Sequence, residues 1–199
     1  MSLQLAEQYE DNEQYSEAFD EYKKLHEKDP KDLSVIERLG HLAMLLDKKE
    51  DAANYYSKIL EFDATNELAY EQLMDIYVNT DRFKYYTYRG NLHQIEQKFE
   101  HAINDYKKAL ANTQEEKDAN ATRFVLATLY EQTGQNLKAI DEYLKILDFE
   151  DTPEEAFLKL ANLYLKEDAK GSAIEVLERA RKHGYESNNI LENLAQIYI

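Results

Sequence analysis

The sequence of 199 residues contains no cysteine and no tryptophan, and only two prolines and five glycines. The absence of cysteine excludes a disulfide framework, a thiolate metal site and a catalytic thiol. The scarcity of proline and glycine is typical of helices joined by short turns. No apolar run approaches the roughly 18 residues of a membrane-spanning helix, so we expect no membrane segment. No apolar signal segment follows the start of the chain, and we therefore expect a cytoplasmic protein.

Basic residues are also few. The chain has 24 Lys and Arg against 40 Asp and Glu, which gives a formal net charge of −16. Such a surface repels phosphate backbones and anionic lipids, so we expect neither nucleic acid nor a membrane as a partner. A basic or mixed-charge peptide would be steered toward it. The alternative is that the acidic residues only keep the protein soluble.

The stretch 120–153 shows the clearest pattern in the chain: two apolar stripes at helical spacing, separated by a glycine and followed by a proline. The residues of this pattern are Leu126, Ala127, Leu129, Tyr130, Gly134, Ala139, Tyr143, Ile146 and Pro153. The glycine permits a tight turn, and the proline stands where a helix must already have stopped. We therefore expect two antiparallel helices that approach closely at the small residues Ala127 and Ala139.

These positions resemble the tetratricopeptide repeat (TPR), a unit of about 34 residues with L-G-x2-Y, A-x3-F and late-P motifs. Here the motifs read Leu126-Ala127-x2-Tyr130 and Ala139-x3-Tyr143, with a proline slightly later than usual. The resemblance implies an all-α fold, a right-handed superhelical solenoid of antiparallel helix pairs. It also implies that the first helix of each pair lines a concave groove in which partner peptides lie. One repeat cannot bury its own apolar face, so each repeat needs neighbours.

The same pattern recurs along the chain, so we expect a single TPR solenoid domain over residues 1–199. The predicted repeats span residues 1–32, 33–66, 67–82 (partial), 83–119, 120–153, 154–187 and 188–199, the last being a half-repeat that caps the stack. At the start of repeat 154–187 we expect a capping box. Thr152 would be its cap, Pro153 the first helical residue, and Glu155 the acid that reaches back.

The repeat pattern is irregular near residues 79–97, where about half of the usual period is missing. Residues 81–84 look like the start of a second helix that does not continue in register. Instead Arg89-Gly90 restarts a first-helix pattern, so two first-type helices would follow each other. A real deletion, a functional break in the superhelix and a loss of residues from the chain are all compatible with this seam. Self-association through the seam near Tyr85 would make the protein a homo-oligomer.

The resemblance identifies ten candidate peptide-binding residues on the groove side of the first helices. They are Glu37, His41, Met44, Glu71, Asp75, Val78, Thr87, Asn91, Thr128 and Glu131. Relatives that bind acidic chaperone tails use Lys, Asn and Arg at such positions, whereas this groove begins with Glu and Asp. We therefore expect a basic or amphipathic partner segment, docked as a helix or an extended chain. The alternative is that these residues are ordinary surface acids.

No spacing of residues predicts catalysis, a cofactor or a metal site. His93, Glu96 and Glu100 would share a face only on one continuous helix, and the repeat register places a turn near Gln97. We therefore expect a non-enzymatic scaffold that binds a protein or peptide. The alternative is a substrate-recruiting TPR fragment of a larger enzyme or signalling regulator. That alternative is favoured by a first repeat without a leading cap and a chain that stops on Ile199 without a helix-ending signal.

Overall fold

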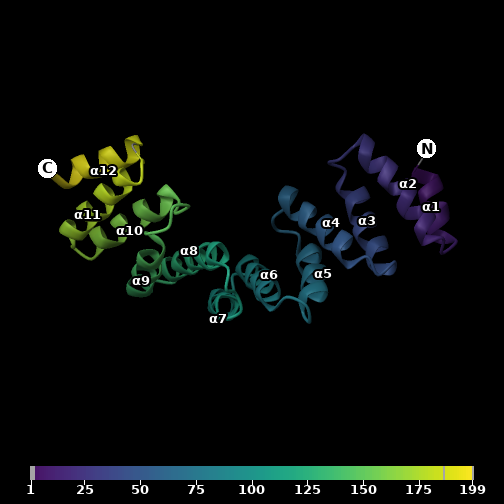
Figure 1. Cartoon of the computed structure of the whole chain (residues 1–199), viewed down its shortest axis with the longest axis horizontal. Coiled ribbons are helices and arrows are strands. Elements are labelled where there is room, and N and C mark those ends of the chain that lie inside the picture. The colour runs from purple at the N-terminus through teal and green to yellow at the C-terminus, as the bar shows by residue number, and fades with distance from the viewer. Residues whose placement is uncertain (1–2, 186, 199) are drawn as a thin grey trace. The chain divides into compact units, whose positions relative to one another are not determined.

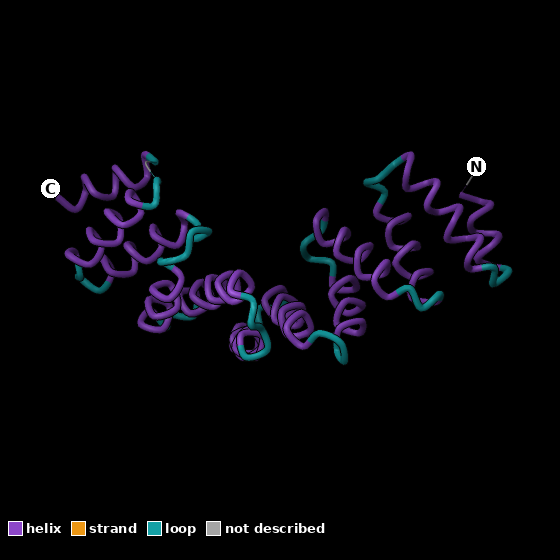
Figure 2. Tube along the Cα trace, viewed as in Figure 1, coloured by secondary structure: helices purple, strands orange, loops and turns teal. Residues whose placement is uncertain are grey.

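The computed structural model describes residues 3–185 and 187–198, and over these residues it contains twelve helices and no strand (Figures 1 and 2). The helices are α1 (Leu3–Asp11), α2 (Tyr15–Lys28), α3 (Leu33–Leu45), α4 (Lys49–Phe62), α5 (Glu67–Tyr77), α6 (Arg82–Ile95), α7 (Phe99–Leu110), α8 (Glu116–Gln132), α9 (Asn136–Ile146), α10 (Glu154–Lys166), α11 (Lys170–Lys182) and α12 (Asn188–Tyr198). The predicted all-α fold is confirmed.

The chain divides into two compact units, unit 1 (Met1–Lys98) and unit 2 (Phe99–Ile199). Within each unit, every helix packs against the helix before it and the helix after it in the chain. This nearest-neighbour packing is the arrangement of a repeat solenoid, in which each pair buries its apolar face against the next. The boundary falls directly after the region 79–97, where the sequence is irregular. The expectation of one continuous solenoid over residues 1–199 stays a prediction.

The helices begin in two different ways. α3, α5 and α6 follow an extended residue whose side-chain oxygen accepts backbone N–H bonds from the first turn, namely Asp32, Asn66 and Asp81. α2, α4, α9 and α11 have no such cap and follow a tight turn with one residue at positive φ. The turn residues at positive φ are Glu13, Asp47, Gly134 and Asp168. The first helices α3, α5 and α6 therefore start at side-chain caps, whereas the first helices α8 and α10 have none, and these second helices start at helix-ending turns.

The region 79–97 contains one regular helix, α6. Residues 81–84 are not the start of a separate second helix, because they form the capped first turn of α6. α6 begins as first helices do, and it ends in a turn with Gln97 at positive φ, the kind of turn that precedes second helices. α5 packs against α6, with the ring centroids of Tyr77 and Tyr88 5.9 Å apart. α5 therefore has a helical partner within unit 1.

The core of unit 1 depends on a glycine at the point where α3 meets α4. Gly40 is buried, and a Cβ atom placed on it would lie 3.0–3.2 Å from three ring atoms of Tyr56. The missing side chain therefore lets the buried Tyr56 ring lie against the backbone of α3. This is the close approach that the small motif residue predicts.

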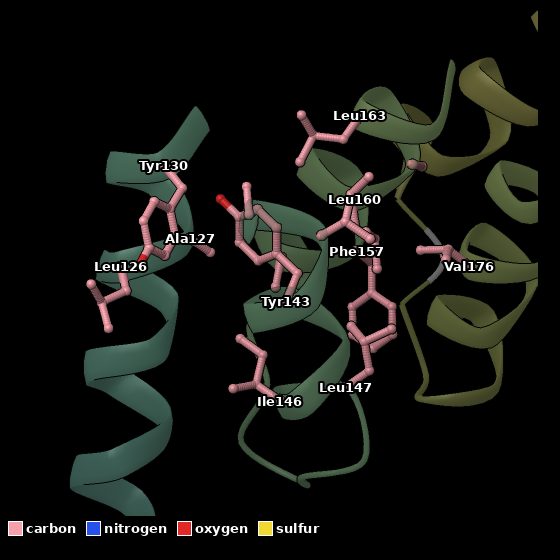
Figure 3. Close-up of a cluster of buried hydrophobic side chains, with 14 of the residues drawn as sticks. Leu126, Ala127, Tyr130, Tyr143, Ile146, Leu147, Phe157, Leu160, Leu163 and Val176 are labelled. Carbon is pink, nitrogen blue, oxygen red and sulfur yellow. The ribbon is translucent and has the colours of Figure 1, made fainter. Parts of the chain in front are cut away.

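Unit 2 repeats this arrangement with alanine at the close approach. Ala127 and Ala139 are completely buried between α8 and α9. Figure 3 shows Tyr143 of α9 lying between the apolar face of α8 and the side chains of α10, among them Leu160. The apolar faces of three successive helices thus form one core, as the repeat requires.

The capping box expected at the start of α10 does not form. Thr152 is only 3% exposed, and its hydroxyl donates to the backbone carbonyl of Ile146 at the end of α9. α10 begins at Glu154, with Pro153 as the N-cap residue and no side-chain cap bond. Because the helix begins one residue later than expected, Thr152 lies too far from its free N–H groups and closes the preceding helix instead.

Candidate functional site

Unit 1 carries a hollow of about 180 Å³ between the first helices α3 and α5. The hollow is lined by Glu37, Arg38, His41, Tyr56, Leu68 and Gln72. Two of the ten predicted groove residues, Glu37 and His41, therefore lie at the same hollow, one turn apart on α3. We call this site the α3–α5 hollow.

The floor of the α3–α5 hollow is the ring of Tyr56, which comes from the second helix α4. The ring is buried and reaches the hollow because Gly40 leaves room for it. Burial raises the pKa of the Tyr56 hydroxyl, and the negative charge of Glu37 raises it further. The hydroxyl is therefore protonated at physiological pH, and it can donate as well as accept a hydrogen bond.

The α5 wall of the hollow is formed by Leu68 and Gln72, and two acids continue the same face of α5 beyond the hollow. Leu68 is 42% exposed, which leaves apolar surface open beside the polar Gln72. Glu71 and Asp75 are exposed and follow Leu68 at helical spacing, so they continue the same face of α5. An extended or helical segment lying along this face would meet one leucine followed by two carboxylates.

The predicted acids of unit 1 have no ion-pair partner in the part of the chain that the structure describes. This holds for Glu37, Glu71 and Asp75. The neighbouring Arg38 points its guanidinium to Glu10 instead, at 3.3 Å. Glu10 also accepts a hydrogen bond from the Tyr22 hydroxyl, at 3.2 Å. The nearest cation is thus already paired with another carboxylate.

Of the eight candidates in unit 1, only Glu37 and His41 line the hollow; Glu71 and Asp75 lie beside it on α5, and Met44, Val78, Thr87 and Asn91 lie elsewhere. Met44 is half-buried and packs against the core, whereas Val78 is exposed directly after the end of α5. Thr87 is half-buried on α6, and its hydroxyl donates to the carbonyl of Phe83 at 2.9 Å. Asn91 is half-buried one turn further along α6.

The two candidates of unit 2 are already engaged within the chain. The hydroxyl of Thr128 donates to the carbonyl of Phe124 at 3.0 Å and lies 3.2 Å from the Tyr143 hydroxyl. The carboxylate of Glu131 lies 3.4 Å from the Lys166 ammonium and 3.8 Å from that of Lys159, both on α10. The predicted groove position Glu131 of unit 2 is therefore a carboxylate that is neutralised internally.

Sequence reasoning missed four residues of the hollow: Arg38, Tyr56, Leu68 and Gln72. It considered only the usual groove positions and treated the tyrosine as a packing residue. Leu68 could have been found from helical spacing, because it lies three residues before Glu71, and Gln72 follows Leu68 by four residues. Nothing in the local sequence indicates that the buried Tyr56 ring would line a hollow between two first helices.

Other kinds of site are not found in the described residues. Over residues 3–185 and 187–198, no group of three or more His, Asp or Glu side chains could hold a metal ion. Over the same ranges, each helix is too short or too polar to cross a membrane.

Comparison with known proteins shows likeness in structure only. No protein-family model matches the sequence, and no curated protein matches it. Among solved structures, the chain is similar to the APC/C hetero-tetramer Cut9-Hcn1, with a TM-score of 0.57 and 20% identity over 98% of this chain and 42% of that chain.

Two more solved structures are similar over most of their own length. The C-terminal part of a TPR repeat-containing protein from Cytophaga hutchinsonii has a TM-score of 0.52 and 18% identity over 92% of this chain and 79% of that chain. YrrB, a TPR protein with an unusual peptide-binding site, has a TM-score of 0.51 and 16% identity over 86% of this chain and 96% of that chain. This chain therefore has the fold of the tetratricopeptide-repeat proteins, as its motifs predict.

Proposed function

We propose that this protein is a non-enzymatic interaction scaffold that binds a basic, amphipathic segment of a partner protein over the α3–α5 hollow of unit 1. The observation that carries the proposal is the set of exposed carboxylates without ion-pair partners in the described residues, Glu37, Glu71 and Asp75. Glu37 lines the hollow, and Glu71 and Asp75 continue the α5 face beside it. Unpaired carboxylates attract cationic groups, and they lose no internal ion pair when they bind one.

The size and lining of the hollow favour a peptide over a small molecule. At about 180 Å³ it is smaller than the sites of drug-sized ligands, which usually exceed about 300 Å³. It has room for one apolar side chain against Leu68 and the ring of Tyr56. Lys or Arg residues of the bound segment, on either side of this apolar side chain, would then meet Glu37 and Glu71. The peptide-binding site of YrrB supports a peptide ligand by analogy of fold.

The proposal is tested with a fluorescently labelled peptide of alternating lysine and leucine and three forms of the full chain. Changing Glu37, Glu71 and Asp75 together to Lys should weaken binding at least about tenfold, because each lost charge contact contributes roughly 0.5–1 kcal/mol. A matched control changes three exposed acids on second helices, Asp20, Asp51 and Glu61, to Lys. Both variants alter the net charge equally, but the control keeps Glu37, Glu71 and Asp75. The control should therefore retain most of the affinity.

The control also defines the contrary result. If both triple variants lose affinity to the same extent, the peptide responds to net charge alone and the assignment to the α3–α5 hollow is wrong. If neither variant loses affinity, the carboxylates of unit 1 do not bind the peptide. Circular dichroism of each variant checks that the helical fold persists.

A further inference from the structure

Unit 2 contains a larger pocket, of about 560 Å³, that no repeat motif predicts. It lies between the first turns of α8 and the connection from α9 to α10. Its wall is apolar, with Phe124 and Val125 from α8 and Ile146, Phe149 and Pro153 from the opposite side. We call it the α8–α10 pocket.

Two departures from the repeat create this pocket. α8 has 17 residues and begins at Glu116, whereas the other first helices of the chain have 9–14 residues. The α9–α10 connection spans residues 147–153, whereas the α2–α3 and α4–α5 connections span only 29–32 and 63–66. The extra turns of α8 and the extra loop residues face each other across the pocket.

The loop side of the pocket is held in place by buried contacts. Leu147 is completely buried, and the Thr152 hydroxyl donates to the carbonyl of Ile146. The Tyr185 hydroxyl donates to the carbonyl of Thr152 at 2.7 Å. These contacts fix the loop at both ends, so the pocket is formed before any ligand arrives and less ordering free energy is lost on binding.

The rim of the pocket is acidic. Glu116, Glu150 and Asp151 surround the apolar wall with one cation, Lys117, and all four side chains are exposed. An acidic rim disfavours anionic amphiphiles such as fatty acids. A chain with a net charge of −16 also disfavours a second copy of itself as the occupant. The complementary ligand is apolar at its centre and positively charged at its edges.

We propose that the α8–α10 pocket is a second binding site, which takes one bulky aromatic side chain of a partner protein flanked by Lys or Arg residues. Phe124 and Phe149 offer ring faces and edges to an aromatic guest. The rim carboxylates would pair with the flanking cations, and a buried aromatic anchor inside a polar rim is the usual anatomy of an interaction hot spot. The site lies wholly within unit 2 and does not depend on the α3–α5 hollow.

The composition of the chain allows a clean assay. The protein has no tryptophan, so the indole of a bound peptide is the only one in the sample. The probe is a hexapeptide of sequence KKWLKK with blocked termini, and its emission should shift to the blue and saturate as the full chain is added. The peptide EEWLEE, with the same apolar centre and opposite charge, should bind at least about tenfold more weakly.

Filling the pocket should weaken the binding of KKWLKK. Ala121 lines the pocket and is exposed, so Ala121→Phe puts a ring into the pocket without disturbing the core, and it should weaken KKWLKK binding at least about tenfold. Ala111→Phe, at an exposed position of unit 2 outside the pocket, is the matched control and should leave binding unchanged. Thermal unfolding by circular dichroism confirms that both variants keep their fold.

Charge reversal tests the rim separately. The double variant Glu150→Lys with Asp151→Lys should weaken KKWLKK binding, whereas Glu175→Lys with Glu192→Lys, which makes the same change in net charge away from the pocket, should not.

Full binding to Ala121→Phe would overturn the proposal. Loss of binding only in the unit 1 variant, with Lys at positions 37, 71 and 75, would also overturn it and would leave the α3–α5 hollow as the peptide site. Uptake of neutral Nile red that KKWLKK does not displace would make the pocket a small-molecule site and would refute a peptide ligand.

Discussion

Units 1 and 2 use the same repeat position for opposite chemistry. Glu37 precedes the motif leucine Leu39 by the same spacing as Phe124 precedes Leu126. Glu37 places a carboxylate at the α3–α5 hollow of unit 1, and Phe124 forms part of the apolar wall of a pocket in unit 2. The repeat therefore fixes where a side chain lies, and the identity of that side chain decides which ligand chemistry the surface offers.

The acids of the two units also differ in their partners. Glu37 and Glu71 have no ion-pair partner among the described residues, whereas Glu131 faces two lysines of α10. A carboxylate on the groove side can thus be free to bind a ligand or can hold two neighbouring repeats together. Only the first kind supports recognition of a basic segment.

The largest expected effect comes from a cavity in either core. Leu39→Ala and Leu126→Ala each remove a fully buried side chain and should lower the free energy of unfolding by about 2–5 kcal/mol. Because each helix packs mainly on its neighbours in the chain, amide hydrogen exchange should accelerate most in α3–α5 for the first variant and in α8–α10 for the second. Equal acceleration in both units from either variant would contradict this local packing.

The second prediction uses two helical glycines with opposite surroundings. Gly40→Val should lower the free energy of unfolding by about 1–3 kcal/mol, because the new side chain meets the Tyr56 ring. In Gly171→Ala of α11 the new Cβ atom meets no atom within 4 Å. This variant should raise the free energy of unfolding by about 0.5–1 kcal/mol, because alanine favours the helix more than glycine does. Urea unfolding measures both changes. If Gly40→Val left the free energy of unfolding unchanged, the close approach of α3 and α4 would be able to relax.

A smaller effect separates the two kinds of carboxylate. Glu131→Gln removes partly exposed ion pairs with Lys159 and Lys166 and should lower the free energy of unfolding by about 0.2–1 kcal/mol at low salt. Glu37→Gln removes no ion pair within the described chain and should leave stability unchanged. The difference between the variants should shrink in molar salt, where surface charges are screened. A loss in Glu37→Gln equal to that in Glu131→Gln would show that the two acids do not differ in this way.

The smallest effect concerns one buried tyrosine in each unit. The pKa of Tyr22 and that of Tyr143 are both raised to about 12, first by burial. Glu10 raises the pKa of Tyr22 through its charge and its hydrogen bond, whereas the hydrogen bond with Thr128 lowers that of Tyr143. Glu10→Gln should therefore lower the pKa of Tyr22, and Thr128→Val should raise that of Tyr143. Carbon-13 NMR of the labelled tyrosine rings measures both values.

The same tyrosines set a limit on alkaline stability. The pKa of each tyrosine is about 12 in the folded state and 10 in the unfolded chain, so the protonated hydroxyl stabilises the fold fully below pH 10. That stabilisation is lost as the pH rises from 10 toward 12. Tyr22→Phe and Tyr143→Phe should each flatten the decline of unfolding free energy above pH 10. A decline as steep in both variants as in the parent chain would assign alkaline unfolding to other groups.

Much of the fold follows from local pattern. The stripe Leu126, Ala127 and Tyr130, the small residue at each close approach and the scarcity of proline predict helix hairpins, because helix periodicity is a property of short segments. The same reasoning misplaced the start of α10, since Thr152 and Glu155 fit a capping box in sequence while the chain bonds Thr152 back to α9. It also took residues 81–84 for the start of a second helix, whereas Asp81 caps α6, a helix that begins as first helices do.

The sequence by itself determined the helices, the small-residue contacts and the excess of acid, because each of these is set by residues a few positions apart or by composition. Only the tertiary structure decided which acids are free and which are paired, since Glu131 meets its lysines from another helix pair. Only the tertiary structure formed the α8–α10 pocket, where a lengthened helix faces a lengthened loop. Both candidate sites lie between repeats, and contacts between repeats depend on side chains that are distant in the chain.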